Sequence, residues 1–198
     1  ANFYSSNHAR DKAKARYQDY NEFLLSLEME GVVQRVNKGS IERAVQLVNK
    51  TNQFNLTTRR IQKAEMVDIS NDHKGFLALE GRLSDIYGDN GLVSILIGRI
   101  TDDVCHIEWW LMSCRVLKRE FEYAMFEQFV AHCLAMKISK IQGEYIPTNK
   151  NQMVCDLFLT LGFDLISSSP NSQIWELPVD KYEKRALPIS LSDKLVIG

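Results

Sequence analysis

The feature that most constrains the fold is a run of three apolar, strand-like segments in the middle of the chain. They span residues 75–86, 91–100 and 104–114, and turn residues separate them. Residues 88–91 read Gly-Asp-Asn-Gly, and Asn-Gly supplies the positive φ that a tight hairpin turn needs. Residues 101–103, Thr-Asp-Asp, mark a second turn. Three consecutive antiparallel strands are therefore expected.

Segments with helical periodicity surround these strands, because their apolar residues recur three and four positions apart. Helices are expected at 8–29, with Gly31 as the residue that ends it, and at 41–50, 120–137 and 151–161. Further strands are expected at 63–69, 140–145, 163–167 and 172–177, with an extended arm over 178–198. This order predicts an α+β or α/β layered domain with an N-terminal helical extension.

Charge and cysteine spacing argue against several classes of protein. The chain has 24 basic and 25 acidic residues, a balance that does not favour a nucleic-acid partner. No apolar run approaches the ~20 residues that a bilayer-spanning helix needs. No pair of its four cysteines has the Cys-x-x-Cys spacing of a zinc site. We expect no metal, no nucleic-acid or membrane partner, and a reduced, cytoplasmic protein. Because the chain opens on Ala1, we also expect it to be part of a longer protein.

Residues 51–60 fit neither a helix interior nor a core strand. They contain three amide side chains and three threonines, which bond readily to nearby backbone. The segment is either a structured loop or a binding loop that presents neutral donors and acceptors to a ligand. Its composition does not decide between the two.

Two stretches in the second half of the chain carry a family pattern. The turn after the third strand reads Arg115-Val-Leu-Lys-Arg-Glu120, and a later stretch runs from Asn151 through Val154 and Phe158 to Gly162-Phe163. Their order and spacing resemble the cofactor-binding half of the GNAT acyltransferases. In that half, an Arg-x-x-Gly-x-Gly/Ala turn joins a strand to a helix, and an Asn-x-x-Ala/Val stretch follows the next strand. The resemblance implies the GNAT fold, in which a mixed central sheet carries helices on both faces.

Four blocks give a more specific resemblance: KTNQFNLTTRR (50–60), YGDNGLV (87–93), SCRVLKRE (113–120) and GEYIPTNKN (143–151). In this order they resemble the C-terminal domain of FkbH-like proteins. In that family a Mg²⁺-dependent HAD-type phosphatase domain precedes this module. Together they take the glyceryl unit of 1,3-bisphosphoglycerate and load glycerate as a thioester on an acyl carrier protein. The product feeds polyketide extender units of the methoxymalonyl type.

The FkbH-like resemblance also implies a domain division and a set of partners. Residues 1–50 would be a helical extension from an upstream phosphatase domain, 51–180 the GNAT-like domain, and 181–198 a C-terminal arm. The partners would be an acyl carrier protein and the phosphatase domain, in cis or in trans. The domain would bind no cofactor of its own, and the phosphopantetheine arm of the carrier would be a co-substrate.

Cys114 is the residue best placed to form a thioester. It stands at the junction of a strand and the following helix, where helix N–H groups and basic neighbours favour a thiolate. The alternative is a buried filler, because cysteine often behaves as a small hydrophobic residue. That role is the expected one for Cys105, Cys133 and Cys155.

A general base is harder to identify from the sequence. His106 and His132 lie too far along their own elements from Cys114. Asp89 and Glu144, which fall in the family blocks, are the better candidates. The alternative for each of them is a simple turn or surface acid, and that alternative is the favoured one.

Lys118 and Glu120 stand where the GNAT turn has glycines. Glycine there lets backbone amides close on a pyrophosphate, so the two side chains argue against ordinary coenzyme A acetyl transfer. Residues expected to hold the phosphate of a phosphopantetheine arm are Arg115, Lys118, Arg119 and Asn151. Residues expected to bind the hydroxyls of a polyhydroxy acyl group are Asn52, Asn55 and Thr58.

The expected function is therefore glyceryl transfer through a Cys114 thioester. A coenzyme A-dependent N-acyltransferase is one rival. A catalytically silent module that docks a carrier protein is the other.

Overall fold

The computed structural model describes residues 3–192, and an eight-stranded mixed sheet forms the centre of this part of the chain. The strands are β1 (Met29–Arg35), β2 (Phe76–Asp85), β3 (Gly88–Thr101), β4 (Val104–Met112), β5 (Lys140–Tyr145), β6 (Asp164–Ser169), β7 (Ser172–Pro178) and β8 (Ile189–Leu191). Their order across the sheet is β6-β7-β5-β4-β3-β2-β1-β8. The pairs β4–β5 and β1–β8 are parallel, and the other neighbours are antiparallel.

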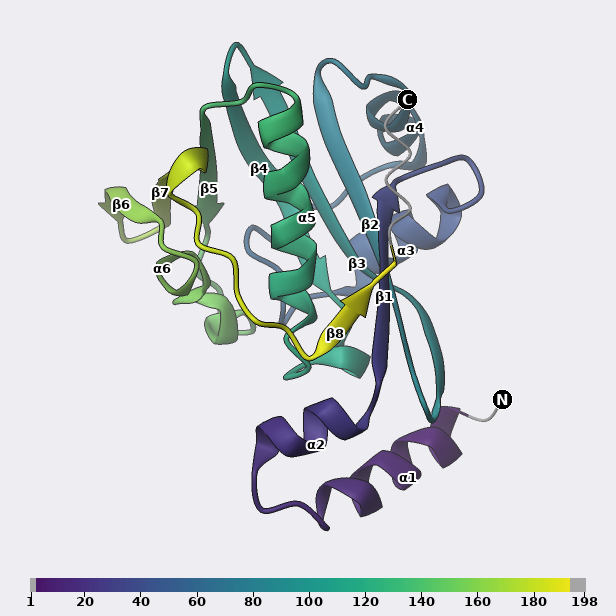
Figure 1. The fold of residues 1–198 in the computed structure, drawn as a ribbon. Helices are drawn as coiled ribbons and strands as arrows, with labels where there is room; N and C mark the ends of the chain where they lie inside the picture. Colours follow the sequence, from purple (N-terminus) through teal and green to yellow (C-terminus); the bar gives the residue numbers. More distant parts are fainter. Residues whose placement is uncertain (1–2, 193–198) are drawn as a thin grey trace.

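Helices cover both faces of this sheet (Figure 1). They are α1 (Phe3–Lys14), α2 (Tyr20–Ser26), α3 (Ile41–Lys50), α4 (Lys63–Asn71), α5 (Phe121–Ala135) and α6 (Leu157–Thr160). Helix α5 lies along one face, while α3 and α4 lie against the other. The expected α+β layering is confirmed.

Two hydrophobic cores follow from this arrangement, because successive strand residues point to opposite faces. In β4, Trp110 packs on the α5 side, and its ring stacks on Phe126 with centroids 5.5 Å apart. Its neighbour Trp109 packs on the α3 side with Ile95 and Ile97 of β3. Both tryptophans are therefore core residues.

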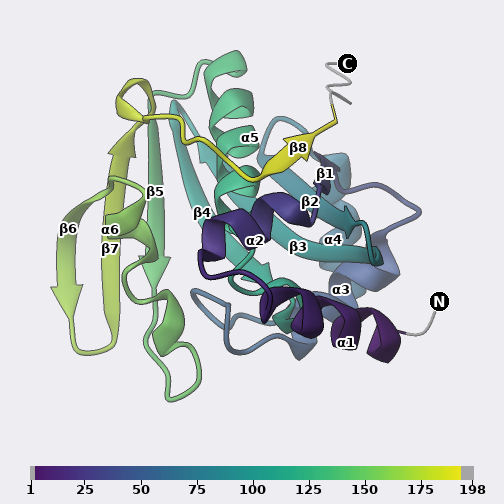
Figure 2. The ribbon, with the colours of Figure 1, turned by 60° about the horizontal axis from the view of Figure 1, so that its bottom comes forward.

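The N-terminal part differs from the single helix expected at 8–29. The chain forms α1 and α2, which lie beyond one end of the sheet in Figure 1 and come to the front in Figure 2. Asp19 separates them, since its side chain accepts a hydrogen bond from Asn21 N at 2.8 Å and caps α2. Strand β1, which we did not expect, then joins the sheet, so residues 29–50 belong to its layers. Gly31 lies inside β1 instead of ending a helix, where a Cβ would stand 3.0 Å from Leu191 and 3.1 Å from Phe121.

The strand expected at 63–69 is also wrong, because this segment is helix α4. Met66 and Ile69 are buried three positions apart on one helical face and pack into the core beneath α3 and α4. Apolar residues at 64 and 67, and at 66 and 69, stand three positions apart, which is helical spacing, whereas strict alternation breaks between 66 and 67.

The three central strands are confirmed, but the β2–β3 turn lies at residues 86–87, before the Gly-Asp-Asn-Gly stretch. Asp85 accepts a hydrogen bond from Tyr87 N at 2.9 Å and shapes this turn. The pairing of β2 with β3 shifts between Arg82 and Ser84, and Gly91 has a φ of +69° beside that irregularity. The Gly-Asp-Asn-Gly stretch thus forms a bulged strand start instead of a hairpin turn.

The C-terminal third follows the expected order with shorter helices. Helix α5 and the hairpin of β6 and β7 are confirmed. The helix expected at 151–161 is a 3₁₀ turn, Gln152–Val154, followed by the short α6. The arm crosses back to place β8 beside β1, and its residues 193–198 lie outside the described part. Within residues 3–192, no helix has the length and apolar character to cross a membrane.

Candidate active site

Strands β4 and β5 separate after four paired residues, and the chain fills the gap with its own loop. Their pairing runs from Val104–Lys140 to Ile107–Gly143. Beyond it, Phe54 O accepts from Met112 N at 3.0 Å, and Leu56 N donates to Trp110 O at 3.2 Å. On the other side, Leu56 O accepts from Ile146 N at 2.9 Å. The edge of β4 is therefore already paired where it leaves β5.

Two asparagines inside the protein hold this loop. Asn55 donates to Thr51 O at 3.0 Å and accepts from Thr58 N at 2.9 Å. Asn151 donates to Asn55 O and Ile146 O, both at 2.9 Å. Both asparagines are fully buried. These contacts use the amides of Asn55 and Asn151 within the loop, where we had expected them to bind an acyl group and a phosphate. Thr58, with a φ of +54°, is part of the same structured loop.

A cavity of about 990 Å³ opens where β4 ends, on the side of the sheet covered by α3. Its size lies near the top of the range of roughly 300–1,000 Å³ for small-molecule sites. Of the expected site residues, Asn52, Cys114 and Arg115 line it. Asn52 accepts a hydrogen bond from the Arg60 guanidinium. The loop 51–60 is thus a structured element whose first part, residues 51–54, faces a cavity.

The cavity carries a strongly positive lining. Four cations contribute to it: Arg43, Lys50, Arg115 and Lys150. Four amide side chains also contribute: Gln46, Asn52, Gln53 and Asn149. No carboxylate is among the fourteen lining residues. The pKa of Arg43 is lowered by burial and by the nearby positive charge of Arg115. The sequence showed no sign of this cluster, because its members come from three distant segments.

Cys114 is the exposed cysteine of the described chain. It begins a three-residue 3₁₀ turn, Cys114–Val116, that Ser113 caps by accepting a hydrogen bond from Arg115 N at 3.4 Å. Helix α5 begins only at Phe121, so the expected stabilisation of a thiolate by the start of a long helix is absent. The positive charges near Cys114 come instead from the cavity.

The other three cysteines are poor nucleophiles by position. Cys105 and Cys133 are fully buried in the α5 core, as expected. The pKa of Cys133 is raised far above its usual range by a hydrogen bond with Cys105 and by burial. Burial also raises the pKa of the half-buried Cys155.

Neither expected general base lies beside Cys114. Asp89 accepts from Gly91 N at 2.6 Å. Ser113, the neighbour of Cys114, donates its N–H to Val93 O of β3. Val93 stands four residues after Asp89, so Asp89 lies roughly 13 Å along the strand from this contact. Glu144 binds Arg59 at 3.0 Å and Ser172 at 2.7 Å, and it lines a separate cavity of about 140 Å³. Both acids have structural partners and are absent from the lining of the Cys114 cavity.

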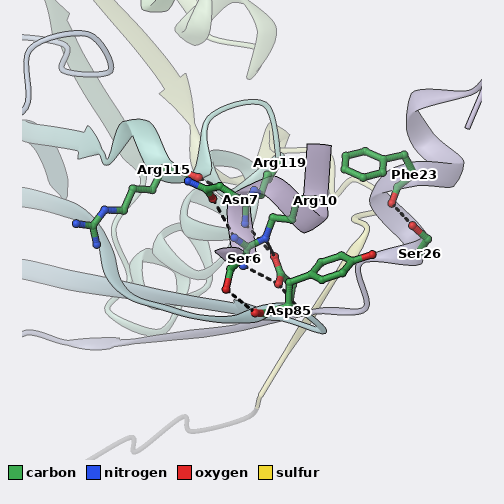
Figure 3. Close-up of polar contacts among 9 residues, drawn as sticks. Ser6, Asn7, Arg10, Phe23, Ser26, Asp85, Arg115 and Arg119 are labelled. Atoms are coloured by element: carbon green, nitrogen blue, oxygen red, sulfur yellow. Dashed lines mark hydrogen bonds and ion pairs between the residues drawn. The ribbon is translucent and has the colours of Figure 1, made fainter. Parts of the chain in front are cut away.

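Arg119 is a buried structural residue where we had expected a phosphate ligand. Its guanidinium donates to Asp85 at 3.0 Å and to Arg115 O at 3.0 Å. Arg10 of α1 makes two bonds to the same carboxylate, at 2.7 and 2.8 Å, and the Asp85 side chain is fully buried (Figure 3). The pKa of Arg119 is lowered by burial and by Arg10. This network ties α1, the β2–β3 turn and the 113–120 turn together.

Solved structures resemble this arrangement of sheet, helices and turn. No family model and no curated protein matches the sequence. The ribosomal-protein-S18-alanine N-acetyltransferase from Escherichia coli is 11% identical, with a TM-score of 0.58 over 79% of this chain and 98% of its own. The GNAT domain of S. lividans PAT is 15% identical, with a TM-score of 0.58 over 74% and 89%. This chain has the GNAT fold.

A third GNAT structure was solved with ligands bound. It is the spermidine N-acetyltransferase from Vibrio cholerae in complex with CoA and spermine, 10% identical, with a TM-score of 0.57 over 77% of this chain and 98% of its own. At such identities these likenesses concern the fold. They do not extend to the FkbH-like resemblance, which stays a prediction.

The turn that precedes α5 keeps the backbone of a glycine turn without the glycines. Lys118 and Glu120 both have a φ of +64°, in the left-handed region that favours glycine. The Tyr20 hydroxyl of α2 donates to Lys118 O at 2.5 Å and holds the turn from outside. The two positions that the GNAT pattern assigns to glycine therefore have the backbone geometry that favours glycine.

A second, smaller cavity lies on the α5 side of the GNAT turn. It measures about 180 Å³ and shares Phe54 and Met112 with the Cys114 cavity. Lys118 lines this cavity and not the larger one. So does Glu122, which has one buried carboxylate oxygen without a hydrogen-bond partner. Burial raises the pKa of Glu122, and the charge of Glu120 adds to the rise.

Proposed function

We propose that this chain is an acyltransferase whose reaction takes place in the Cys114 cavity. The observation that carries the proposal is an exposed thiol in a cavity of about 990 Å³, at the end of the β4 strand of a GNAT fold. The cavity is large enough for an activated acyl compound.

Direct acyl transfer from an acyl-coenzyme A to an amine is the first candidate route. Structures with the same fold are N-acetyltransferases, and one was solved with CoA and spermine. In this route the amine nitrogen attacks the thioester carbonyl. Coenzyme A leaves as the thiolate, and the amine gives up a proton. No protein residue becomes acylated.

A covalent relay through Cys114 is the second candidate route, and the exposure of Cys114 in the cavity favours it. The thiolate attacks the acyl carbonyl, the donor's leaving group departs with its electron pair, and an enzyme thioester forms. The thiol of a phosphopantetheine arm then attacks this thioester and releases the Cys114 thiolate. For the glyceryl unit that the FkbH-like resemblance implies, an HAD-type phosphatase would act with this domain on the donor.

Intact-mass spectrometry of the protein and of the small molecules, after incubation with acetyl-coenzyme A and the polyamine spermine, separates the two routes. Direct transfer predicts an acetylated polyamine, no protein adduct, and an unchanged rate in Cys114→Ser. The relay predicts an acetyl adduct on the native protein that is missing in Cys114→Ser and that an acyl carrier protein in its thiol form removes. Calorimetry adds a check, because micromolar binding of coenzyme A supports the direct route and a Kd above about 1 mM opposes it.

A second version of this experiment uses a glyceryl donor, and both versions are needed before the proposal is rejected. Here 1,3-bisphosphoglycerate, an HAD-type phosphatase and the carrier protein replace acetyl-coenzyme A. The absence of any adduct or acylated product in both versions would overturn the acyltransferase proposal. It would leave a module that only docks a carrier protein.

A further inference from the structure

The positive lining of the Cys114 cavity is a local property of the fold. The whole chain has 24 basic and 25 acidic residues, so no general excess of positive charge accounts for four cations and no carboxylate in one cavity. Charges of one sign that line a concave site concentrate ligands of the opposite sign there. The cavity therefore favours anions.

The four cations stand on different walls of the cavity. Arg43 and Lys50 lie on α3 seven residues apart, which is about two helical turns or roughly 10 Å along the axis. Arg115 belongs to the turn after β4, and Lys150 to the loop before Asn151. One phosphate or carboxylate group is too small to reach charges spread over such a distance.

Among the described residues, three of the four cations, Arg43, Lys50 and Lys150, have no carboxylate as an ion-pair partner. Arg43 binds the neutral side chain of Gln46 at 2.5 Å. Burial lowers the pKa of Arg43, and the charge of Arg115, which lines the same cavity, lowers it further. An anion between these two guanidiniums would relieve that repulsion.

We infer that the Cys114 cavity binds small molecules that carry at least two negatively charged groups, with Arg43 and Lys50 on one wall and Arg115 and Lys150 on the others. The charged groups are phosphates or carboxylates, and the four amide side chains suit the polar atoms between them. This inference deepens the proposed function, because it defines the donor that delivers an acyl group to the cavity.

The charge of an alkylating reagent tests the inference without any acyl transfer. Iodoacetate is anionic, whereas iodoacetamide is neutral and of nearly the same size. We expect the ratio of their rates at Cys114, followed by peptide mapping, to exceed the ratio for free 2-mercaptoethanol several-fold at low salt. The excess should fall as ionic strength rises, because salt screens the attraction.

Single substitutions then locate the charges. Arg43→Gln, Lys50→Gln and Lys150→Gln should each lower the iodoacetate-to-iodoacetamide ratio about twofold, as expected for a unit charge several ångströms from the thiol in a water-filled cavity. Lys50→Arg should keep the ratio. Lys74→Gln, at an exposed position away from the cavity, is the matched control and should leave it unchanged.

Protection of Cys114 shows how many charges the ligand needs. Pyrophosphate should slow the alkylation of Cys114 by iodoacetamide at concentrations at least tenfold lower than inorganic phosphate. Coenzyme A is compared with pyrophosphate in the same assay. Stronger protection by coenzyme A would identify a nucleotide donor, and stronger protection by pyrophosphate would identify a smaller phosphorylated donor. Equal protection by phosphate and pyrophosphate would overturn the inference, as would a ratio at Cys114 that matches 2-mercaptoethanol. Because no acyl group moves in these assays, they stand or fall separately from the proposed function.

Discussion

Lys118 and Glu120 show how a residue can occupy a backbone position that its side chain disfavours. Both have a φ of +64°, where the Cβ of any residue other than glycine meets the following carbonyl oxygen at a cost of roughly 1–2 kcal/mol. Their surroundings impose the conformation: Tyr20 fixes Lys118 O, and Arg119 between them is anchored on Asp85. The turn is thus shaped by its contacts and not by its own sequence.

We therefore expect Lys118→Gly to stabilise the protein by about 1 kcal/mol, because it removes the backbone strain at φ +64°. Glu120→Gly should give less, since it also removes a carboxylate at the N-terminus of α5, which contributes about 0.3–1 kcal/mol. Urea unfolding monitored by tryptophan fluorescence measures both. Lys184→Gly, an exposed position without positive φ, is the control and should not stabilise. A loss of stability in Lys118→Gly would contradict this account.

At the scale of elements, one buried carboxylate holds three segments together. Asp85 ends β2, Arg10 belongs to α1, and Arg119 belongs to the turn before α5. Helix α1 has little apolar surface to bury, and its other contacts with the hairpin are polar, such as Ser6 Oγ to Tyr87 O at 2.9 Å. The position of α1 and the shape of the turn therefore depend on the same ion pairs, and Figure 3 shows the side chains converging on Asp85.

The network of Asp85, Arg10 and Arg119 predicts that substitutions of its members lower the stability by unequal amounts. Asp85→Asn should destabilise the protein by about 3–5 kcal/mol, because it leaves two buried guanidiniums without a counter-charge. Arg10→Gln should cost only about 1–3 kcal/mol, since Asp85 and Arg119 remain paired. Chemical denaturation of both variants tests the order. Equal losses would contradict the central role of Asp85, because they would mean that the Asp85–Arg119 pair left in Arg10→Gln contributes no stability.

At the scale of the whole molecule, the helices sit directly on the sheet where strands lack side chains. Gly143 of β5 faces Phe158 of α6, and a Cβ on Gly143 would lie 2.1 Å from the Phe158 ring. The Phe158 ring also contacts Trp110, Phe163 and Trp175. This aromatic cluster joins the sheet to the layer of α5 and α6, and it leaves no room for an extra methyl group.

Gly143→Ala should therefore destabilise the protein by about 1–3 kcal/mol through overpacking. Gly39→Ala is the matched control, because its Cβ would meet only Asn37 Oδ1 at 3.2 Å in an exposed turn. We expect that change to stay within about 0.5 kcal/mol. Thermal unfolding followed by circular dichroism compares them, and a neutral Gly143→Ala would show that Phe158 moves aside freely.

Local sequence determined the elements whose periodicity had one interpretation. Strands β2, β3 and β4, helix α5 and the β6–β7 hairpin follow from apolar spacing, and with the Arg115–Glu120 and Asn151–Phe163 patterns they predicted the GNAT fold. The strand predicted at 63–69 was wrong, because Met66 and Ile69 have helical spacing and packing beneath the sheet buries both. β1 was missed because Gly31 reads as a helix end in isolation.

The site was decided by tertiary structure, because it depends on contacts between residues distant in the chain. Cys114 could be identified from its place after β4, but the cations beside it come from residues 43–50, 115 and 150. Asn55 and Asn151 looked like ligands of a substrate, and burial turned them into partners of the backbone. Arg119 was predicted to be a phosphate ligand, but in the fold its guanidinium donates to the carboxylate of Asp85, 34 residues away in the chain. The type of a polar residue, known from the sequence, shows which hydrogen bonds it can make. Only the fold decides which partner lies near enough to make them.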